Sequence, residues 1–423
     1  MTTRNSRETL RNQPELPLLS HHPKLKLSDM LALRAGRAFN GEHTLAGPLT
    51  VVTENGTIKA IEQGHPEIPN AELIDLGPTS TVLPGLIDTH VHLCADSENG
   101  ALDRLPGFTP DHLDTVIKDS LTRHLHAGVT TVRDLGDHQW SVVNQRGNHT
   151  QHIQASGPPI TSKSGHCWSM GGEATGENAL RNSVRERAER NVDVIKVMAS
   201  GGFATPGTNV SDCQFTEQEL RAVVEEAHKH GLPVTAHTHS LSSAQRAVAA
   251  GVDGLEHLSC LTDHGMRVPP DLLDALAEAE ITVCHTLGVT QEPPPFIREA
   301  WEKIGMSYAG KVSMAGQMYD HGVRTVAGTD GGISNGKGHG IIAYGVADLV
   351  KGGVPNAGAL AAATSQAARS LGLTKGMLKP GWDADIIAVR GDPMRDITAL
   401  HNVTTVIIAG QIVTTTLPTD RRE

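Results

Sequence analysis

The sequence predicts an α/β protein of the (β/α)8 TIM-barrel class, joined to a smaller β-rich unit made from both ends of the chain. Three observations support this prediction. The middle of the chain repeats an apolar run followed by an amphipathic helical pattern, in eight successive units. The unusual polar residues fall where the apolar runs end. A closed barrel would gather those ends into one site, whereas a doubly wound open sheet, the alternative, would spread them along an edge.

The two ends of the chain are rich in strand patterns. Residues 1–28 have the polar composition of a solvated tail. In the run 48–64, Asn55-Gly56 lies between alternating apolar residues, which is a strong hairpin signal. The runs 383–391 and 404–413 have the same character. We therefore expect three parts: a tail (1–28), a composite β-domain (29–84 with 377–416) and a barrel (85–376).

The expected barrel strands alternate with helices in the middle of the chain. Several helical patterns end in glycine, the residue most often found after a helix, as at Gly128, Gly231 and Gly251. The strands are expected at residues 83–93, 128–136, 158–165, 193–199, 233–238, 254–258, 281–287 and 324–330.

The composition argues against several classes of protein. Lys+Arg number 36 against 47 Asp+Glu, a formal net charge of −11, so a nucleic-acid partner is not expected. No run of about 20 apolar residues predicts a membrane span, and the first residues lack a secretory apolar core. The 5 cysteines form no CxxC pair. We expect a cytoplasmic protein with a small-molecule ligand, and its 23 histidines point weakly to a metal enzyme.

The first candidate ligands are His90 and His92, at the end of the first expected strand. Side chains two residues apart on a strand point to the same side, so two imidazoles can approach one metal ion. An isolated His-x-His pair is a weak signal, but here it follows Pro84-Gly85 in an otherwise apolar strand.

Lys196 interrupts the apolar strand DVIKVMA. The common interpretation is a lysine whose amine reaches solvent. The surrounding valines predict a buried strand instead, where an ammonium is rarely tolerated without a partner. A desolvated lysine has a depressed pKa, and its nucleophilic amine could capture carbon dioxide to form a carbamate that bridges metals like a carboxylate.

Three further candidates end later strands: His237, His257 and Asp330. Taken singly, the histidines fit polar turn residues and Asp330 fits a helix N-cap. Their common position at strand ends, together with His90, His92 and Lys196, favours one shared site.

These segments resemble the amidohydrolase superfamily, in its imidazolonepropionase-like and prolidase-like branch. The resemblance spans about residues 30–415 and rests on PGLIDTHVHL, DVIKVMASGG, AHTH, EHLS, AGTDGG and the tail ALAAATSQAARSLGL…GMLKPGWDADIIAV…DP. It implies a barrel beside a composite β-sandwich, and two divalent metal ions, usually zinc. By this resemblance His90, His92, Lys196 and Asp330 would hold the more buried ion, and carboxylated Lys196, His237 and His257 the more exposed one.

The resemblance also implies a reaction. A metal-bridging water would lose a proton near neutral pH, and Asp330 would orient that hydroxide and pass its proton to the leaving nitrogen. The expected reaction is hydrolysis of an amide-type C–N bond in an Xaa-Pro dipeptide, an N-acyl amino acid or an aryl amide. Phenylureas and carbamates stay open as substrates. Zinc, manganese and cobalt all suit such ligands.

Other residues have weaker assignments. His166 and His239 are expected to contact substrate or stabilise an oxyanion, or else to be loop histidines facing water. Arg133 could bind a substrate carboxylate or pair with Asp134. His285 is a candidate for the pocket wall.

Small and aromatic residues complete the expected pocket. The pairs Gly201-Gly202 and Gly331-Gly332 are expected to let backbone approach the site closely. Three aromatic residues in loops after strands are candidates to shape the pocket: Trp140, Trp168 and Phe203.

Two alternatives compete with a binuclear hydrolase. One-metal deaminases and cyclic-amidine hydrolases look similar, but they generally lack the strand-four lysine and carry an acidic residue shortly after the strand-five histidine. Here Lys196 is present and THSLSSAQ follows His237. A non-enzymatic assembly protein of the same fold would have lost ligand positions that this chain keeps. Relatives are often multimeric, so we expect a homo-oligomer.

Overall fold

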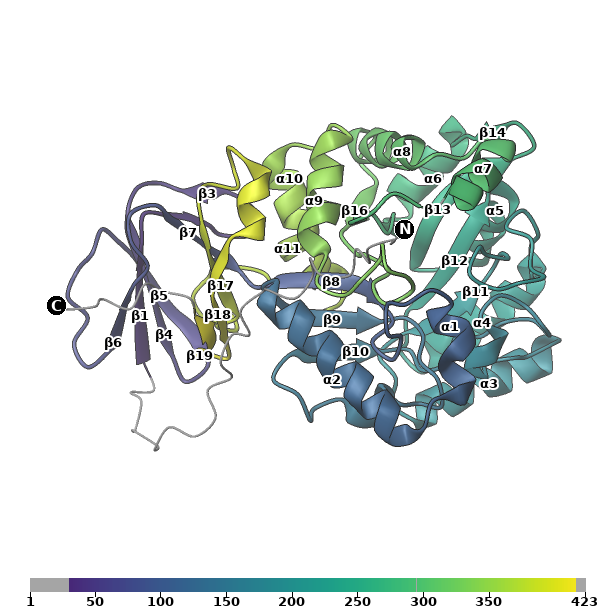
Figure 1. Cartoon of the computed structure of the whole chain (residues 1–423), viewed down its shortest axis with the longest axis horizontal. Helices are drawn as coiled ribbons and strands as arrows, with labels where there is room; N and C mark the ends of the chain where they lie inside the picture. Colours follow the sequence, from purple (N-terminus) through teal and green to yellow (C-terminus); the bar gives the residue numbers. More distant parts are fainter. Residues whose placement is uncertain (1–29, 294, 416–423) are drawn as a thin grey trace, which may run out of the picture.

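The computed structural model describes residues 30–293 and 295–415. The predicted tail, residues 1–28, lies outside the described residues. A β-rich end and a larger α/β body lie side by side along the long axis of the molecule (Figure 1).

One sheet of the β-rich end comes from the N-terminal part of the chain, in the order β5-β4-β1-β6. Strands β4 and β5 are antiparallel. The turn between them is formed by Asn55 and Gly56, with φ of 51° and 79°, so the predicted hairpin is confirmed. The strands are β1 (Met30–Ala35), β4 (Leu49–Glu54), β5 (Thr57–Gln63) and β6 (Glu72–Asp75).

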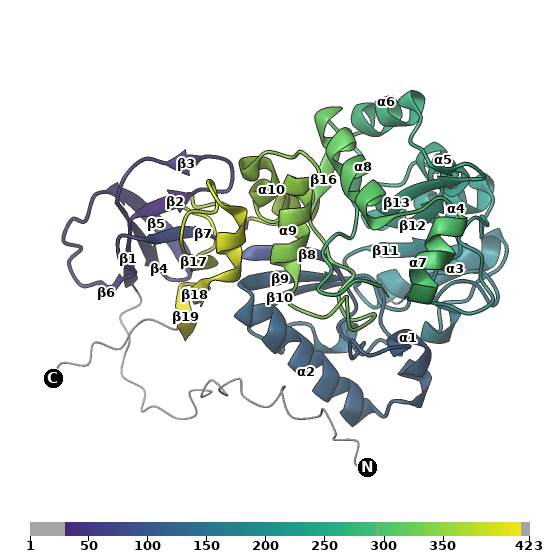
Figure 2. The ribbon, with the colours of Figure 1, turned by 45° about the horizontal axis from the view of Figure 1, so that its top comes forward.

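The second sheet contains strands from both ends of the chain, in the order β19-β18-β17-β7-β2-β3. Its central pair is antiparallel and places Ile386 opposite Pro84. Buried Leu33, Val82 and Ile386 belong to one apolar cluster that both segments share. Strands from both segments lie next to one another in the β-rich end (Figure 2). The strands are β2 (Arg37–Phe39), β3 (Thr44–Leu45), β7 (Ser80–Pro84), β17 (Ile386–Arg390), β18 (Val403–Ile408) and β19 (Gln411–Thr415).

The α/β body has parallel strands in two sheets, ordered β10-β9-β8 and β11-β12-β13-β15-β16. A short strand, β14, adds antiparallel pairing to β13. The strands are β8 (Leu86–Val91), β9 (Val129–Asp134), β10 (His152–Ala155), β11 (Ile195–Met198), β12 (Val234–Ser240), β13 (Gly254–Thr262), β14 (Gly265–Met266), β15 (Thr282–Cys284) and β16 (Arg324–Val326).

Among the described residues the predicted closed barrel is not one continuous ladder. The edges of the two parallel sheets are joined only by single parallel bridges, Val91 with Gly331 and Ile160 with Val197. The strand expected at 158–165 is replaced by β10 earlier in the chain. Pro158 and Pro159 explain the difference, because proline has no N–H to donate to a ladder.

Helices connect the parallel strands and cover the outside of the body (Figures 1 and 2). The predicted helix-ending glycines, Gly128, Gly231 and Gly251, all have left-handed φ between 68° and 88°. The helices are α1 (Ala101–Arg104), α2 (Pro110–His126), α3 (Glu177–Glu189), α4 (Glu217–Lys229), α5 (Leu241–Ala250), α6 (Pro270–Glu278), α7 (Pro295–Lys303), α8 (Tyr308–Asp320), α9 (Ile342–Lys351), α10 (Asn356–Ala362) and α11 (Ser365–Ser370).

A large apolar core lies between the helices and the parallel strands. It includes Leu86, Val197 and Leu255 from the strands and Leu220 and Val346 from the helices, each at most 1% exposed. Over residues 30–293 and 295–415, no helix has both the length and the apolar character needed to cross a bilayer.

Candidate metal centre

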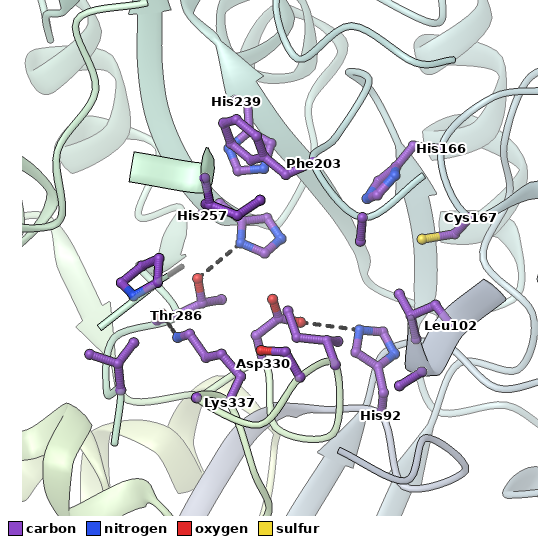
Figure 3. A pocket seen from close by; sticks show the side chains of 18 of the residues that line it. His92, Leu102, His166, Cys167, Phe203, His239, His257, Thr286, Asp330 and Lys337 are labelled. Atoms are coloured by element: carbon purple, nitrogen blue, oxygen red, sulfur yellow. Dashed lines mark hydrogen bonds and ion pairs between the residues drawn. The ribbon is translucent and has the colours of Figure 1, made fainter. Parts of the chain in front are cut away.

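A cavity of about 680 Å³ opens where the parallel strands end. All the residues predicted to bind metal or act in catalysis line it, from six different strand ends and loops (Figure 3). They are His90, His92, His166, Lys196, His237, His239, His257 and Asp330.

The first group of donors joins His90 and His92 to Asp330. Both imidazole Nε2 atoms face the same carboxylate oxygen: Asp330 Oδ1 lies 3.4 Å from His90 and 3.2 Å from His92. The other ring nitrogen of each histidine is already engaged. His90 Nδ1 donates to Glu256 at 2.7 Å, and His92 Nδ1 donates to the carbonyl of Gly136 at 2.9 Å.

These outer bonds decide the tautomers. Because an acceptor holds each Nδ1 hydrogen, each ring turns its Nε2 toward Asp330. Burial lowers the pKa of His92, but the hydrogen bond to Asp330 and its charge raise it above the ordinary value, so a proton on His92 Nε2 must leave before that nitrogen offers a lone pair. Burial alone would raise the pKa of Asp330, but the hydrogen bond from His92 and the nearby imidazoles lower it below its ordinary value. Two lone pairs and a carboxylate converging at this distance form a donor set for a cation.

Lys196 lies beside this group and is 1% exposed. Its Nζ is 3.5 Å from His90 Nε2. Burial lowers the pKa of the amine, despite the nearby carboxylates of Glu256 and Asp330. A neutral buried amine is the form that reacts with carbon dioxide, so the environment suits the predicted carbamate.

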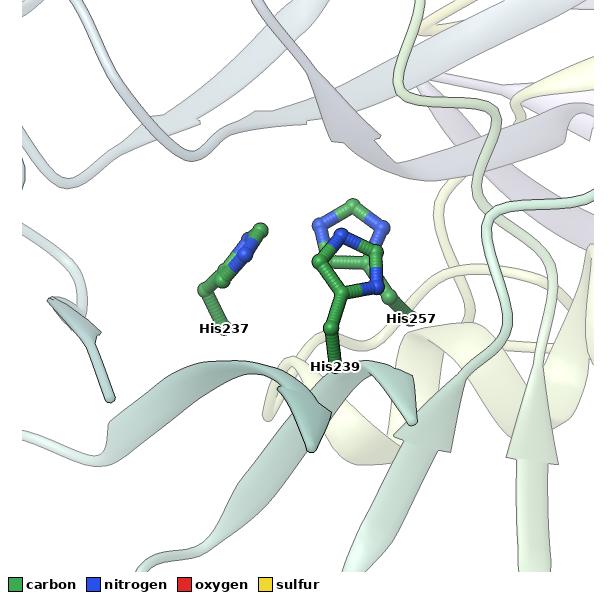
Figure 4. A group of neighbouring side chains, drawn as sticks. All are labelled: His237, His239 and His257. Atoms are coloured by element: carbon green, nitrogen blue, oxygen red, sulfur yellow. The ribbon is translucent and has the colours of Figure 1, made fainter. Parts of the chain in front are cut away.

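The second group consists of His237, His239 and His257, whose ring nitrogens lie within 4.8 Å of one another (Figure 4). The ring centroids of His237 and His257 are 4.5 Å apart, and those of His239 and His257 are 4.9 Å apart. Burial, followed by the neighbouring imidazoles, lowers the pKa of His237 and His257 well below the usual value. The rings are therefore neutral at pH 7 and keep lone pairs.

Each ring of this group is held on one nitrogen. His239 Nδ1 is 2.9 Å from Ser259 Oγ, and His257 Nδ1 is 2.9 Å from Thr286 Oγ1. His237 Nε2 donates to the carbonyl of Gly201 at 3.2 Å. The opposite nitrogens stay available to the cavity. His239, predicted to act on the substrate, thus lies in one group with the two predicted ligands His237 and His257.

His166 reaches the cavity from the loop after β10. Its Nδ1 lies 2.9 Å from Thr205 Oγ1, and its ring centroid is 4.6 Å from that of His237. The backbone of Gly202 passes directly beside it, since a Cβ there would lie 2.3 Å from His166 Nε2. The expected close approach of Gly201-Gly202 is confirmed at this position.

Glu256 is the buried residue that sequence reasoning missed. Besides His90, it accepts hydrogen bonds from Arg133 at 2.9 Å and from Thr235 at 2.7 Å. Burial would raise the pKa of its carboxyl, but His90 and Arg133 lower it strongly. The sequence did contain a signal for Glu256: like Lys196, it is a charged residue inside an apolar run, here GLEHL.

Two of the weaker predictions, for Arg133 and His285, are wrong: neither residue lines the main cavity. Arg133 binds neither substrate nor Asp134: its guanidinium donates to Glu256 and to the carbonyl of Thr89, away from the cavity. His285 does not line the main cavity but a separate small void next to it, which Thr286 also lines.

Of the three aromatic residues predicted to shape the pocket, one lines the cavity and two do not. Phe203 lines the cavity, with its ring 5.0 Å from that of His239. Trp140 packs instead under the guanidinium of Arg190, 4.3 Å from the ring centroid, and Trp168 is 47% exposed outside the cavity lining. Trp301 lines the cavity and was not predicted, because its helix follows a long loop after β15.

Three residues that line the cavity have left-handed backbone: one inside β13, one after β15 and one after β16. His257, Thr286 and Asp330 have φ of 67°, 50° and 60°. Residues with a Cβ adopt this conformation at a cost, and such residues cluster at functional sites. All three side chains line the cavity.

The donor chemistry of both groups fits divalent metal ions. Neutral imidazole and carboxylate donors suit zinc, manganese or cobalt. The outer hydrogen bonds of the rings are of the kind that orient metal-bound histidines. The residues at the cavity therefore form two adjacent candidate metal sites.

Comparison with known proteins supports this interpretation. A model of the amidohydrolase family matches residues 81–413. Ochratoxinase from Aspergillus niger is 27% identical over 356 residues, covering 75% of this chain and 71% of that protein. A 5′-deoxyadenosine deaminase from Methanosarcina acetivorans is 27% identical over 368 residues, covering 80% of this chain and 79% of the relative.

Among solved structures, an Xaa-Pro dipeptidase with bound methionine in its active site superimposes with a TM-score of 0.79. It is 26% identical, and the match covers 90% of this chain and 99% of the dipeptidase. The similarity extends over both the β-rich end and the α/β body.

Proposed function

The chain belongs to the amidohydrolase family, and from that premise we propose that this hydrolytic enzyme uses two divalent metal ions, with zinc expected, to cleave an amide-type C–N bond. Xaa-Pro dipeptides, N-acyl amino acids and aryl amides are the proposed substrates. The names of the similar proteins, an Xaa-Pro dipeptidase and an ochratoxinase, support hydrolysis but leave the compound open.

One observation carries this proposal: two groups of buried donors face each other across Lys196. His90, His92 and Asp330 form one group, and His237 and His257 belong to the other. The charge of Lys196 lowers the pKa of His237 and His257, so it is close to both. A carbamate on Lys196 would give the two groups a shared oxygen ligand, as the sequence resemblance implies.

When bound, the metal ions supply an acidified water and an electrophile for the substrate carbonyl. The chain supplies the proton transfer. Asp330 has one oxygen toward His90 and His92, which leaves its other oxygen to take the proton of the attacking water and to deliver it to the leaving nitrogen.

His166 and His239 are proposed to stabilise the carbonyl oxygen. When the hydroxyl of Thr205 or Ser259 donates to Nδ1, the Nε2 of the same ring carries the hydrogen and can donate into the cavity. Burial lowers the pKa of His166 to about 3, so it is a neutral donor at pH 7.

The second candidate function is a one-metal deaminase or cyclic-amidine hydrolase, which the deaminase relative favours. Phenylurea or carbamate hydrolysis would use the proposed two-metal site unchanged. The number of metal ions per chain distinguishes a one-metal deaminase from the proposed function. A substrate screen distinguishes a phenylurea or carbamate hydrolase from it.

The remaining assignments complete the proposal. We propose that the parallel strands between β8 and β16 form one closed barrel, with the two sheets joined at their edges by the single bridges. The proposed domains are a composite β-sandwich, residues 29–84 with 377–416, and the barrel, residues 85–376. A homo-oligomer is proposed from the resemblance. The five cysteines are free thiols, as is usual in the cytoplasm, and we propose that location.

The test replaces Lys196 and counts metals. The wild-type protein, purified with zinc and bicarbonate, should hold about two metal ions per chain, since two donor groups are present. Lys196→Ala should lose tight binding of the pair, and short carboxylic acids should restore part of the activity. Metal content is read by inductively coupled plasma mass spectrometry, beside hydrolysis of Xaa-Pro dipeptides, N-acyl amino acids, aryl amides and ureas.

Lys351→Ala, at the exposed end of α9, is the matched control and should keep both metals. One ion per chain in the wild type would favour the deaminase alternative. Full activity in Lys196→Ala would refute the bridging carbamate.

A further inference from the structure

Lys311 is a buried amine that the proposed chemistry does not use, and burial and the nearby charge of Lys337 lower its pKa to about 7. It lies in the first turn of α8, lines the cavity and is 7% exposed. Its recorded hydrogen bond is a long one, 3.4 Å from Nζ to Thr286 Oγ1. An ammonium can donate three hydrogen bonds, so most of its capacity points into the cavity unmet.

Two other lysines in buried or half-buried surroundings, outside the metal-binding residues, have stronger partners. Lys375 pairs with Asp383 and Asp385 at 2.9 and 2.7 Å. Lys337 donates to the carbonyls of Thr286 and Thr329 at 2.5 and 2.9 Å. Over the described ranges, no carboxylate lies within 4.0 Å of Lys311 Nζ. A buried amine without a counter-ion gives up its proton readily, and an anion bound beside Nζ would restore the charge and accept the unmet hydrogen bonds.

The position of Lys311 places that anion next to the reacting centre. Thr286 Oγ1 contacts both Lys311 Nζ and, at 2.9 Å, His257 Nδ1. The charge of Lys311 is also the largest influence after burial on the pKa of His239. One hydroxyl group therefore separates the cation from the second donor group.

Tyr308 cannot take over this task, although it lines the cavity one helical turn away. Its hydroxyl donates to Asp348 at 2.5 Å and accepts from the backbone N–H of Gly288 at 2.7 Å. The cavity lining also includes large apolar side chains, among them Phe203, Ile297 and Trp301. The cavity thus offers a cation near the donors and an apolar surface beyond them.

We propose that Lys311 binds the carboxylate of an N-acylated α-amino acid, dipeptides included, and so selects this class among the substrates of the proposed hydrolase. In such a molecule one carbon separates the carboxylate from the scissile nitrogen. That short spacing matches the position of Lys311, which only the hydroxyl of Thr286 separates from His257 in the second donor group. Aryl amides, ureas and carbamates carry no such anion and leave Lys311 unpaired. This inference rests on the proposed function for which bond is cleaved. The binding of a carboxylate by Lys311 does not depend on it.

The experiment separates binding from turnover. Metal-free protein, which cannot run the proposed reaction, is titrated calorimetrically with N-acetyl derivatives of leucine, phenylalanine and proline, and with the corresponding carboxamides. The variants are Lys311→Met, Lys311→Gln and Lys311→Arg, with Lys351→Met as an exposed control. Circular dichroism verifies folding, and Lys311→Gln serves if Lys311→Met does not fold.

The wild type and Lys351→Met should bind at least one acid about 10- to 100-fold more tightly than its amide, the range of a charge-assisted hydrogen bond. Lys311→Met and Lys311→Gln should lose that preference, and Lys311→Arg should keep most of it. Equal binding of acids and amides by the wild type, or a preference that survives in Lys311→Met, would overturn the assignment.

Turnover by the zinc-loaded protein then distinguishes the two proposals. Hydrolysis of acids and amides at equal kcat/KM would remove the role of Lys311 and leave the hydrolase intact. A metal-free protein that prefers acids, with no hydrolysis after zinc loading, would overturn the proposed function and leave the carboxylate site standing.

Discussion

The histidines at the cavity are positioned by partners on the side of the ring away from it. His90 is held by Glu256, His92 by the carbonyl of Gly136 and His257 by Thr286. Such bonds fix both the tautomer and the direction of a ligand ring. Because every partner comes from a different strand or loop, the orientation of the site depends on the assembled sheet rather than on local sequence.

Asp330 should separate metal binding from proton transfer. Asp330→Asn keeps the size of the side chain and an oxygen donor but loses the basic carboxylate. We expect most of the metal to be retained and kcat to fall by about 10²- to 10⁴-fold, the usual contribution of a general base. Metal analysis and steady-state kinetics measure the two effects. Asp320→Asn, at the exposed end of α8, is the control, and unchanged turnover in Asp330→Asn would remove its catalytic role.

For single residues, the sequence could identify candidate site residues but not all of their hydrogen-bond partners. His90, His92 and Asp330 stood out because polar groups ended apolar runs, and the structure brings them together. Arg133 gave the same signal, yet its partner Glu256 lies 123 residues away in the chain. Local pattern carries no information on which strand a buried guanidinium will face.

The strands and loops of the body convert chain positions into a cavity. Strands β15 and β16 end at Cys284 and Val326, before the ends of the predicted runs, and the backbone is left-handed further along, at Thr286 and Asp330. Sequence periodicity predicted that strands exist there but not where they end, since the turn is imposed by neighbouring elements. The exit from the strand, rather than the strand itself, sets the direction of the side chain.

The loop that carries Gly202 should tolerate no side chain. In Gly202→Ala the new Cβ would overlap the imidazole of His166, 2.3 Å from Nε2, so ring or loop must move. We expect kcat to fall by about tenfold or more, with a loss of stability of about 1–3 kcal/mol from overpacking. Kinetics and urea unfolding would be measured.

Gly107→Ala gives the matched control, because an added Cβ there meets no atom within 4 Å. Equal kcat values for Gly202→Ala and the wild type would mean that His166 is not needed at its present position.

For the whole molecule, the layout was the most predictable level. The distribution of apolar runs predicts strands before and after a long α/β segment, and one sheet of the structure joins strands β2, β3 and β7 with β17, β18 and β19, beside an α/β body with parallel strands. The continuity of the barrel ladder was not predictable, because it depends on the proline-containing segment after β10 and on how the two seams close.

Removal of metal should destabilise the whole molecule. A ligand that binds only the native state stabilises it by about 2.7 kcal/mol at 100 times its Kd, so a chelator should lower the Tm of zinc-loaded protein by several degrees and added zinc should restore it. Differential scanning calorimetry measures the shift, which should be smaller in Lys196→Ala. A Tm that is indifferent to chelator in metal-loaded wild type would show that the ions do not couple to folding.

The pairing of β7 with β17 has a consequence for how the chain is made. Strand β7 emerges from the ribosome about 300 residues before its partner, and it directly precedes β8, which carries His90. Until the last segment is synthesised, the backbone N–H and C=O groups along that side of β7 stay open to other chains. Completion of the C-terminus therefore closes a site of misassembly as well as the sheet.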